Sequence, residues 1–144
     1  MKSKSAFTLI ELLIVIAILG VASTFVVFNF RGYQERARDA KRRTELSQYQ
    51  NLLEVYATSH SNRYIDTSGS SVQAISQCSA LGGSSCTDDP DSSKHYMYQS
   101  SNGGGRYVLW AQLDIDDEYY VLCSDGIIKT MPSSWSGPSS GNCP

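Results

Sequence analysis

Residues 7–28 read FTLIELLIVIAILGVASTFVVF, an apolar run whose only charged side chain is that of Glu11. A helix of this length reaches across the hydrocarbon core of a bilayer, which takes about 20 residues. A carboxylate at that depth costs on the order of 3 kcal/mol, so it marks a functional site that needs a cationic partner in the membrane. The run therefore predicts a transmembrane helix over residues 7–30, with Glu11 as its functional residue.

A short basic leader, residues 1–6, precedes this helix and ends in Ala6. The leader and the Phe-Thr-Leu-Ile-Glu-Leu that follows it resemble the prepilin signal of type IV pilins and type II secretion pseudopilins. The resemblance implies that a prepilin peptidase cuts between Ala6 and Phe7, and that the new N-terminus is methylated. It also implies that Glu11 pairs with the amine of Phe7 in a neighbouring subunit during filament assembly.

Two positions differ from the usual pattern of this family. Ala6 stands where the family usually has glycine, so we expect cleavage at a reduced rate. Phe28 stands where many members have a helix-breaking proline, so melting of the helix near this residue is favoured less strongly.

The resemblance implies a structural protein and not an enzyme. Our first expectation is a subunit of a type IV pilus-like filament serving adhesion, motility or DNA uptake, and the alternative is a type II secretion pseudopilin. A signal-anchored binding module or enzyme that never polymerises is a third hypothesis. The implied partners are other copies of the chain, prepilin peptidase, an assembly ATPase and an inner-membrane platform protein.

The expected topology is a single pass through the cytoplasmic membrane, with the C-terminal domain exported and later displayed on a filament at the cell surface. The cysteines support export, because disulfides form in oxidising compartments. The positive-inside rule argues the other way, since only Lys2 and Lys4 precede the apolar run. The basic residues that follow it are Arg31, Arg36, Arg38, Lys41, Arg42 and Arg43.

The net charge of −2 gives no general case for binding nucleic acid. The basic stretch 36–43 has two interpretations, DNA capture or contact with lipid headgroups followed by salt bridges in the filament, and we favour the second. The two histidines, His60 and His95, lie in polar surroundings without a catalytic pattern. Gly103–Gly105 fits a hairpin turn better than a phosphate-binding loop.

The helix is expected to continue through residues 31–57 as a stem. Apolar residues recur there at helical spacing, which indicates a face that packs on a domain. One helix from Phe7 to Ala57 would be about 75 Å long, more than a domain of this size can cover. Its first half must pack on lipid or on other chains. The apolar residues of the packing face are Leu46, Tyr49, Leu52, Leu53 and Tyr56.

An α+β fold is predicted, with this helix packed on a small antiparallel sheet of three to four strands within residues 95–131. Residues 58–94 are predicted to form a polar αβ loop that contains a short helix at Val72–Cys78. The strand segments are rich in aromatic and β-branched residues and are separated by Gly, Asn and Asp. They are expected at residues 96–98, 107–113, 119–123 and 127–131.

Four cysteines, Cys78, Cys86, Cys123 and Cys143, allow three disulfide connectivities, among which sequence cannot choose. The resemblance implies a disulfide-bounded C-terminal loop over residues 132–144, so we expect the two local pairs, Cys78 with Cys86 and Cys123 with Cys143. A metal site of Cys78, Cys86 and His95 lacks the usual zinc spacing.

No cofactor is expected, with calcium as the alternative. Carboxylates cluster near the predicted turns, and secretion pseudopilins of the major type bind calcium in a C-terminal loop. Solvated turn residues are the favoured interpretation, because no complete calcium-binding signature is present. The residues concerned are Asp114, Asp116, Asp117 and Asp125.

Overall fold

The computed structural model describes residues 7–82 and 86–144, and for residues 25–29 it describes the backbone alone. The expected leader over residues 1–6, with the cleavage position Ala6, lies outside the described residues. The chain divides into two compact units, Met1–Glu35 and Arg36–Pro144.

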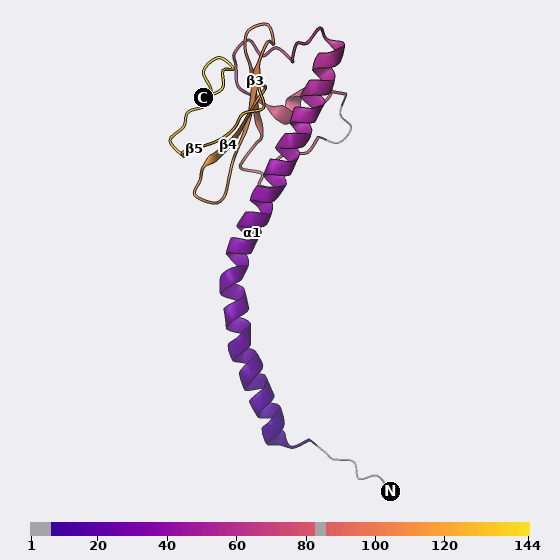
Figure 1. Ribbon diagram of the computed structural model, residues 1–144. Helices are drawn as coiled ribbons and strands as arrows, with labels where there is room; N and C mark the ends of the chain where they lie inside the picture. Colours follow the sequence, from indigo (N-terminus) through magenta and orange to yellow (C-terminus); the bar gives the residue numbers. More distant parts are fainter. Residues whose placement is uncertain (1–6, 83–85) are drawn as a thin grey trace. The chain divides into compact units, whose positions relative to one another are not determined.

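One long helix, α1, spans Leu9–Ser59 (Figure 1). It agrees with the helix expected from Phe7 to Ala57. The helix ends where Ser61 and Asn62 take left-handed backbone conformations and the Asn62 amide donates to the carbonyl of Ala57 at 2.9 Å. A left-handed residue after the last turn is a common helix stop.

In the first unit, the large apolar side chains of residues 9–21 are between 49% and 77% exposed. They point to all sides of the helix, so this unit has no buried core of its own within the described residues. The span expected over residues 7–30 includes 25–29, whose side chains are not described. Across the described part of the chain, no helix combines the length and hydropathy that crossing a membrane requires.

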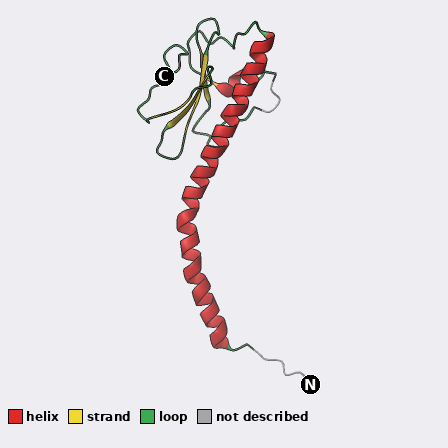
Figure 2. Cartoon of the chain, in the orientation of Figure 1, coloured by secondary structure: helices red, strands yellow, loops and turns green. Residues whose placement is uncertain are grey.

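The second unit is built on an antiparallel sheet (Figure 2, yellow). Its strand order is β1-β2-β3-β4-β5. The α+β fold is thus confirmed, but the sheet has five strands and the predicted three to four is wrong. The additional strand is β1, which pairs with Tyr98 and Met97 of β2. The strands are β1 Val72–Gln73, β2 Met97–Ser100, β3 Tyr107–Gln112, β4 Tyr119–Cys123 and β5 Ile128–Met131.

The short helix expected at Val72–Cys78 is present only as a 3₁₀ turn over Ala74–Gln77. Its first two positions form β1 instead. A two-residue strand is too short to show an alternating pattern, so the residues alone could not distinguish it from a helix start.

The first core lies between α1 and one face of the sheet. Leu46, Tyr49 and Leu53 of the expected helix face are buried, and Leu52 and Tyr56 are partly buried beside them. Alternate residues of the strands meet this face, as the period of two requires. The buried sheet residues of this core are Tyr98, Tyr107, Leu109, Ala111 and Leu122.

The second core lies on the opposite face of the sheet, under the C-terminal segment 132–144. Trp135 packs edge-on against Trp110 and Tyr119, with ring centroids 5.7 Å and 5.5 Å apart. Further along, Gly141 lies directly against the backbone of Ser100 and Ser101. The sheet therefore has both faces covered, one by α1 and the other by this segment (Figure 1, yellow).

Candidate functional site

The start of α1 holds the Glu11 carboxylate in a local hydrogen-bond arrangement. Glu11 Oε2 accepts hydrogen bonds from the Thr8 backbone amide at 2.9 Å and from the Thr8 hydroxyl at 2.8 Å. The Glu11 amide in turn lies 3.4 Å from Thr8 Oγ1. This reciprocal pattern is a capping box, which satisfies amides that have no partner in the first turn.

Glu11 and Phe7 were expected at this site from the sequence, whereas Thr8 was missed. The signal was present, because Thr8-Leu9-Ile10-Glu11 has the Thr-x-x-Glu spacing of a capping box. The arrangement fixes the carboxylate at the helix start, while Phe7 is 87% exposed beside it. Among the described residues no donor reaches Glu11 Oε1, so this oxygen can accept a hydrogen bond from an approaching ammonium.

A buried ion network lies in the second unit and is centred on Arg42. The guanidinium is fully buried and donates two hydrogen bonds to Asp89, Nε to Oδ2 at 2.7 Å and NH2 to Oδ1 at 2.9 Å. Its NH1 group lies 2.7 Å from Asp39 Oδ1 and 2.9 Å from Asp114 Oδ1. One arginine thereby joins α1, the αβ loop and the turn between β3 and β4.

Asp114 is held by three cations. Besides Arg42, Arg38 Nε donates to Oδ2 at 2.5 Å, and Lys94 Nζ donates to Oδ1 at 2.7 Å. Asp39 supports the same turn, since its oxygens accept from the backbone amides of Asp114 and Ile115 at 2.8 and 3.1 Å. The turn is therefore fixed to the helix by side-chain and backbone contacts together.

Electrostatics keep this network charged. Burial acts to raise the pKa of Asp114, but hydrogen bonds from Lys94 and Arg38 and the charge of Arg42 outweigh it and lower the pKa to about 2. Burial likewise acts to lower the pKa of Arg42, but the hydrogen bonds to Asp89 and Asp39 raise it above its usual value.

The basic stretch 36–43 is therefore divided in two. Arg38 and Arg42 are engaged inside the folded unit, so Arg42 cannot meet lipid or DNA without unfolding. Arg36, Lys41 and Arg43 stay exposed. The pairing of Arg42 was not expected from the sequence, because its main partner, Asp89, is 47 residues away.

The structure does not bring the four candidate calcium ligands together. Asp114 is engaged by cations, Asp116 and Asp117 lie in the turn after it, and Asp125 lies in the turn between β4 and β5. Within the described ranges, the one group of three potential ligand atoms is Cys123, Asp125 and Cys143. Calcium at these aspartates stays the alternative to the expectation of no cofactor.

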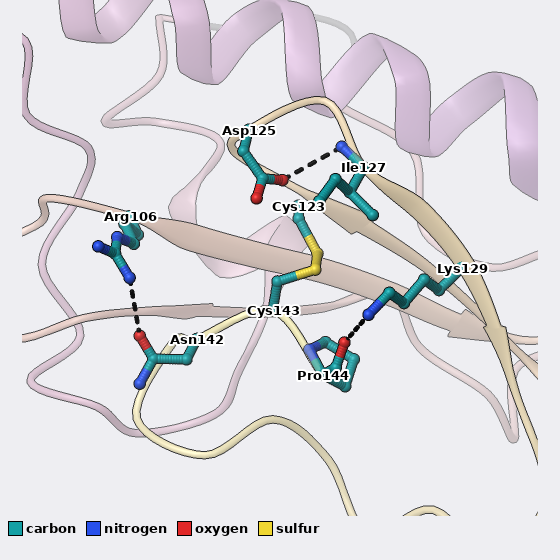
Figure 3. The surroundings of a disulfide bond; sticks show 8 residues. All are labelled: Arg106, Cys123, Asp125, Ile127, Lys129, Asn142, Cys143 and Pro144. Carbon is teal, nitrogen blue, oxygen red and sulfur yellow. Dashed lines mark hydrogen bonds between the residues drawn. A yellow bond between two sulfur atoms is a disulfide. The ribbon is translucent and has the colours of Figure 1, made fainter.

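Figure 3 shows why that group of three is unsuited to a metal. Cys123 and Cys143 are joined in a disulfide, so they offer no thiolate, and Asp125 accepts a hydrogen bond from the Ile127 amide at 3.1 Å. The second disulfide joins Cys78 and Cys86 within the αβ loop. Both local pairs that were expected are present, and this also removes the thiolates from the metal site considered at Cys78, Cys86 and His95.

The histidines have local partners. His60 stacks on Tyr56 with ring centroids 3.8 Å apart, and His95 Nδ1 lies 2.9 Å from Asp88 Oδ2.

Comparison with known proteins bears on the N-terminal part. A family model described as the prokaryotic N-terminal methylation motif matches residues 1–27. The chain carries a prepilin-type N-terminal motif. The resemblance to the type IV pilin and pseudopilin family is confirmed at this end of the chain, and that family is structural.

Two curated relatives carry the description type II secretion system core protein G. The one from Vibrio cholerae serotype O1 is 36% identical over 61 residues, which is 42% of each chain. The one from Aeromonas hydrophila is 36% identical over 66 residues, 46% of each chain. The chain thus spans less than half the length of these curated relatives in the matched region. No solved structure is significantly similar to it.

Proposed function

We propose that this protein is a non-enzymatic, structural subunit of a pilin-like filament that assembles through its N-terminal helix. The observation that carries the proposal is the exposure of the apolar side chains over residues 9–21, which follow a prepilin-type N-terminus. A helix that is apolar on all sides needs lipid or other helices around it. The second unit has its own two cores and does not depend on that surface.

The proposed assembly begins in the cytoplasmic membrane. Prepilin peptidase removes residues 1–6 and frees the amine of Phe7, which is then methylated. The apolar helix anchors the subunit until the Glu11 carboxylate meets this amine in a neighbouring copy, with an assembly ATPase and a platform protein driving the movement. Pairing the two charges offsets the cost of keeping the carboxylate away from water.

The contacts between copies follow from this geometry. The helix of one copy meets a different surface of the next copy, which makes the contact heterologous. Such contacts build an open helix, and not a closed ring, when each copy is also shifted along the axis of rotation. A helical filament is the result.

Two kinds of filament fit the chain. The names of the curated relatives support a pseudopilus of type II secretion. The disulfide-bounded C-terminal loop that ends in Cys143 supports the type IV pilus, because the resemblance implied this loop for pilins.

One experiment tests processing and filament type together. Intact mass and N-terminal sequencing would be measured on filaments sheared from native cells and on the envelope fraction. A chain that begins at methylated Phe7 in the sheared fraction supports a surface pilus, and a processed chain confined to the envelope supports a pseudopilus. An unprocessed chain beginning at Met1 rejects the filament proposal.

A pair of variants tests the role of Glu11. Glu11→Ala is expected to leave cleavage intact and to abolish filaments, whereas Glu35→Ala on the same helix serves as the control and is expected to assemble. Normal filaments from Glu11→Ala would refute the pairing role.

A further inference from the structure

One edge of the sheet is open at β5, which pairs with β4 on one side and with no strand of the described chain on the other. The opposite edge strand, β1, has two residues, and a 3₁₀ turn begins directly after it. The Ala74 amide donates inward to the Tyr96 carbonyl at 2.7 Å, so Gln73 is the residue of β1 that faces outward. The Gln73 carbonyl already accepts from the Ser76 hydroxyl at 2.6 Å. The sheet can therefore be extended at β5 and not at β1.

The backbone groups of β5 alternate between its two sides. The Cys123 amide donates to the Ile127 carbonyl at 3.0 Å, and in an antiparallel pair every second residue continues this bonding. Lys129 therefore turns its N–H and C=O groups toward β4, whereas Ile128 and Thr130 turn theirs away from the sheet. Within residues 7–82 and 86–144, no group forms a hydrogen bond with these outward groups.

Apolar side chains are exposed beside the outward groups. Ile127 is 44% exposed and Ile128 is 58% exposed. The side chains of Ile128 and Thr130 lie on the face of the sheet that packs on α1, as do those of their partners Leu122 and Tyr120. An exposed apolar edge with free backbone groups is a template for a further strand.

A cation lies on each face of the sheet next to this edge. The Lys129 side chain lies on the far face, which the C-terminal segment covers, and its ammonium donates to the Pro144 carbonyl (Figure 3). This contact holds the ammonium in place and leaves it further donors for a carboxylate. On the α1 face the Arg43 guanidinium lies over the ring of Tyr120, 5.1 Å from its centroid, and Tyr120 pairs with Thr130.

Carboxylates lie beyond the two ends of β5. Asp125 precedes the strand and accepts from the Ile127 amide at 3.1 Å. Glu118 comes directly before β4, whose first residue pairs with the last residue of β5. The edge is thus positive at its centre and negative at its ends, so an added strand is favoured when its acidic residue lies beside Lys129.

We infer that β5 binds an extended segment of a partner protein by adding it to the sheet, with an acidic side chain beside Lys129 and β-branched apolar side chains beside Ile128 and Thr130. The outward N–H and C=O groups identify the ligand as an extended backbone, because a strand satisfies them in alternation. The charges identify its central residue as acidic.

A second copy of β5 fits this edge less well. When two antiparallel copies place Ile128 of one opposite Thr130 of the other, their two Lys129 side chains lie directly opposite each other and repel. Such a contact would also be isologous and would close as a dimer. The inferred ligand is therefore a different chain, and the inference lies outside the proposed function and does not depend on it.

The test uses the full-length protein in detergent and the peptide probe acetyl-Ser-Thr-Val-Glu-Val-Thr-Ser-amide, with a second peptide that has Lys in place of Glu. Titration is followed by amide NMR, and hydrogen exchange is measured at each amide. The Glu peptide is expected to bind about five-fold more tightly than the Lys peptide. It should also slow exchange at Ile128 and Thr130 and leave Lys129 unchanged, since the Lys129 amide already bonds to β4. Equal binding of the two peptides, or no slowing at Ile128 and Thr130, would overturn the inference.

Variants locate the binding at the edge. Thr130→Pro removes an outward N–H without removing a bond to β4, and it is expected to weaken binding of the Glu peptide about ten-fold. Thr130→Ala keeps this N–H and is the matched control, expected to bind as the wild type does. Lys129→Glu should reverse the preference, so that the Lys peptide binds more tightly. Wild-type affinity in Thr130→Pro, or an unchanged preference in Lys129→Glu, would reject the site, and a melting temperature close to that of the wild type verifies that each variant folds.

A dilution series detects a second copy at the edge. If the Ile128 and Thr130 amides are protected without peptide, and this protection falls on dilution, β5 pairs with another copy and the inference is wrong. Processing and filament formation are scored in separate experiments. Failure of peptide binding therefore leaves the proposed function standing, and loss of filaments leaves the peptide result unaffected.

Discussion

The guanidinium of Arg42 and the carboxylate of Asp89 form a two-bond ion pair between side chains that are both fully buried, although 47 residues separate them in the chain. The pair ties the αβ loop to α1. A buried ion pair need not add net stability, but removing one partner leaves an uncompensated charge in a buried site. The αβ loop therefore cannot leave α1 at this point without separating two buried charges.

Asp89→Asn is expected to lower the free energy of unfolding by about 3 kcal/mol, because the Arg42 guanidinium loses its main counter-charge while staying buried. Denaturant unfolding of the full chain measures this. Asp88→Asn is the matched control, since the neighbouring side chain is partly exposed and is expected to cost less than about 1 kcal/mol. A similar small loss for Asp89→Asn would contradict the role assigned to the pair.

The stability of the second unit is expected to fall in acid through Asp114. Its pKa is lowered in the folded state from 3.8 to about 2, so its contribution is present above pH 3.8 and is lost as the pH falls toward 2. The shift corresponds to about 2 kcal/mol at neutral pH. Unfolding curves of the wild type and of Asp114→Asn should differ by about this amount at neutral pH and converge near the lowered pKa. A constant difference across this range would rule the mechanism out.

Removing the C-terminal disulfide with Cys123→Ser and Cys143→Ser together is expected to cost about 3 kcal/mol, from the loop-closure entropy of the unfolded chain. The Trp135 ring would also leave Trp110 and Tyr119, so tryptophan emission should move to longer wavelength. The double replacement of Cys78 and Cys86 opens a shorter loop and should leave the emission unchanged. Unaltered fluorescence after loss of the C-terminal bond would show that the segment stays packed without it.

Gly141→Ala is expected to destabilise the protein by about 3 kcal/mol for two reasons. The backbone angle φ of 71° is unfavourable for alanine, and the added Cβ would collide with the backbone of Ser100 and Ser101. Gly126→Ala isolates the first effect, because Gly126 has a φ of 79° but open space around it, and about 1 kcal/mol is expected. Equal melting temperatures for the two variants would argue against the close packing of Gly141.

The parts of the fold that depend on local pattern were predictable from the sequence. The strand at Tyr119–Cys123 was expected at these bounds, and the strands at 107–113 and 127–131 were expected to within one residue. The helix face at Leu46, Tyr49 and Leu53 is buried as its spacing indicated. Each of these signals is a periodicity carried by consecutive residues.

The parts that depend on contacts between distant segments were not predictable in the same way. Arg42 lies in a basic run that is typical of a solvated surface, and nothing near it in the sequence indicates that Asp89 will meet it. Strand β1 exists because Val72 and Gln73 lie beside β2, which no two-residue pattern can indicate. Thr8 is the exception, since its capping spacing to Glu11 was readable and was overlooked.

The bond between Cys123 and Cys143 joins the sheet to the segment that covers its far face. Cys123 is the last residue of β4. Cys143 follows the segment that carries Trp135 across the far face of the sheet. The sulfurs can meet in their native positions only when that crossing is complete. The oxidation state of this pair therefore decides whether the C-terminal segment is a closed loop or is held on the far face by its side-chain contacts alone.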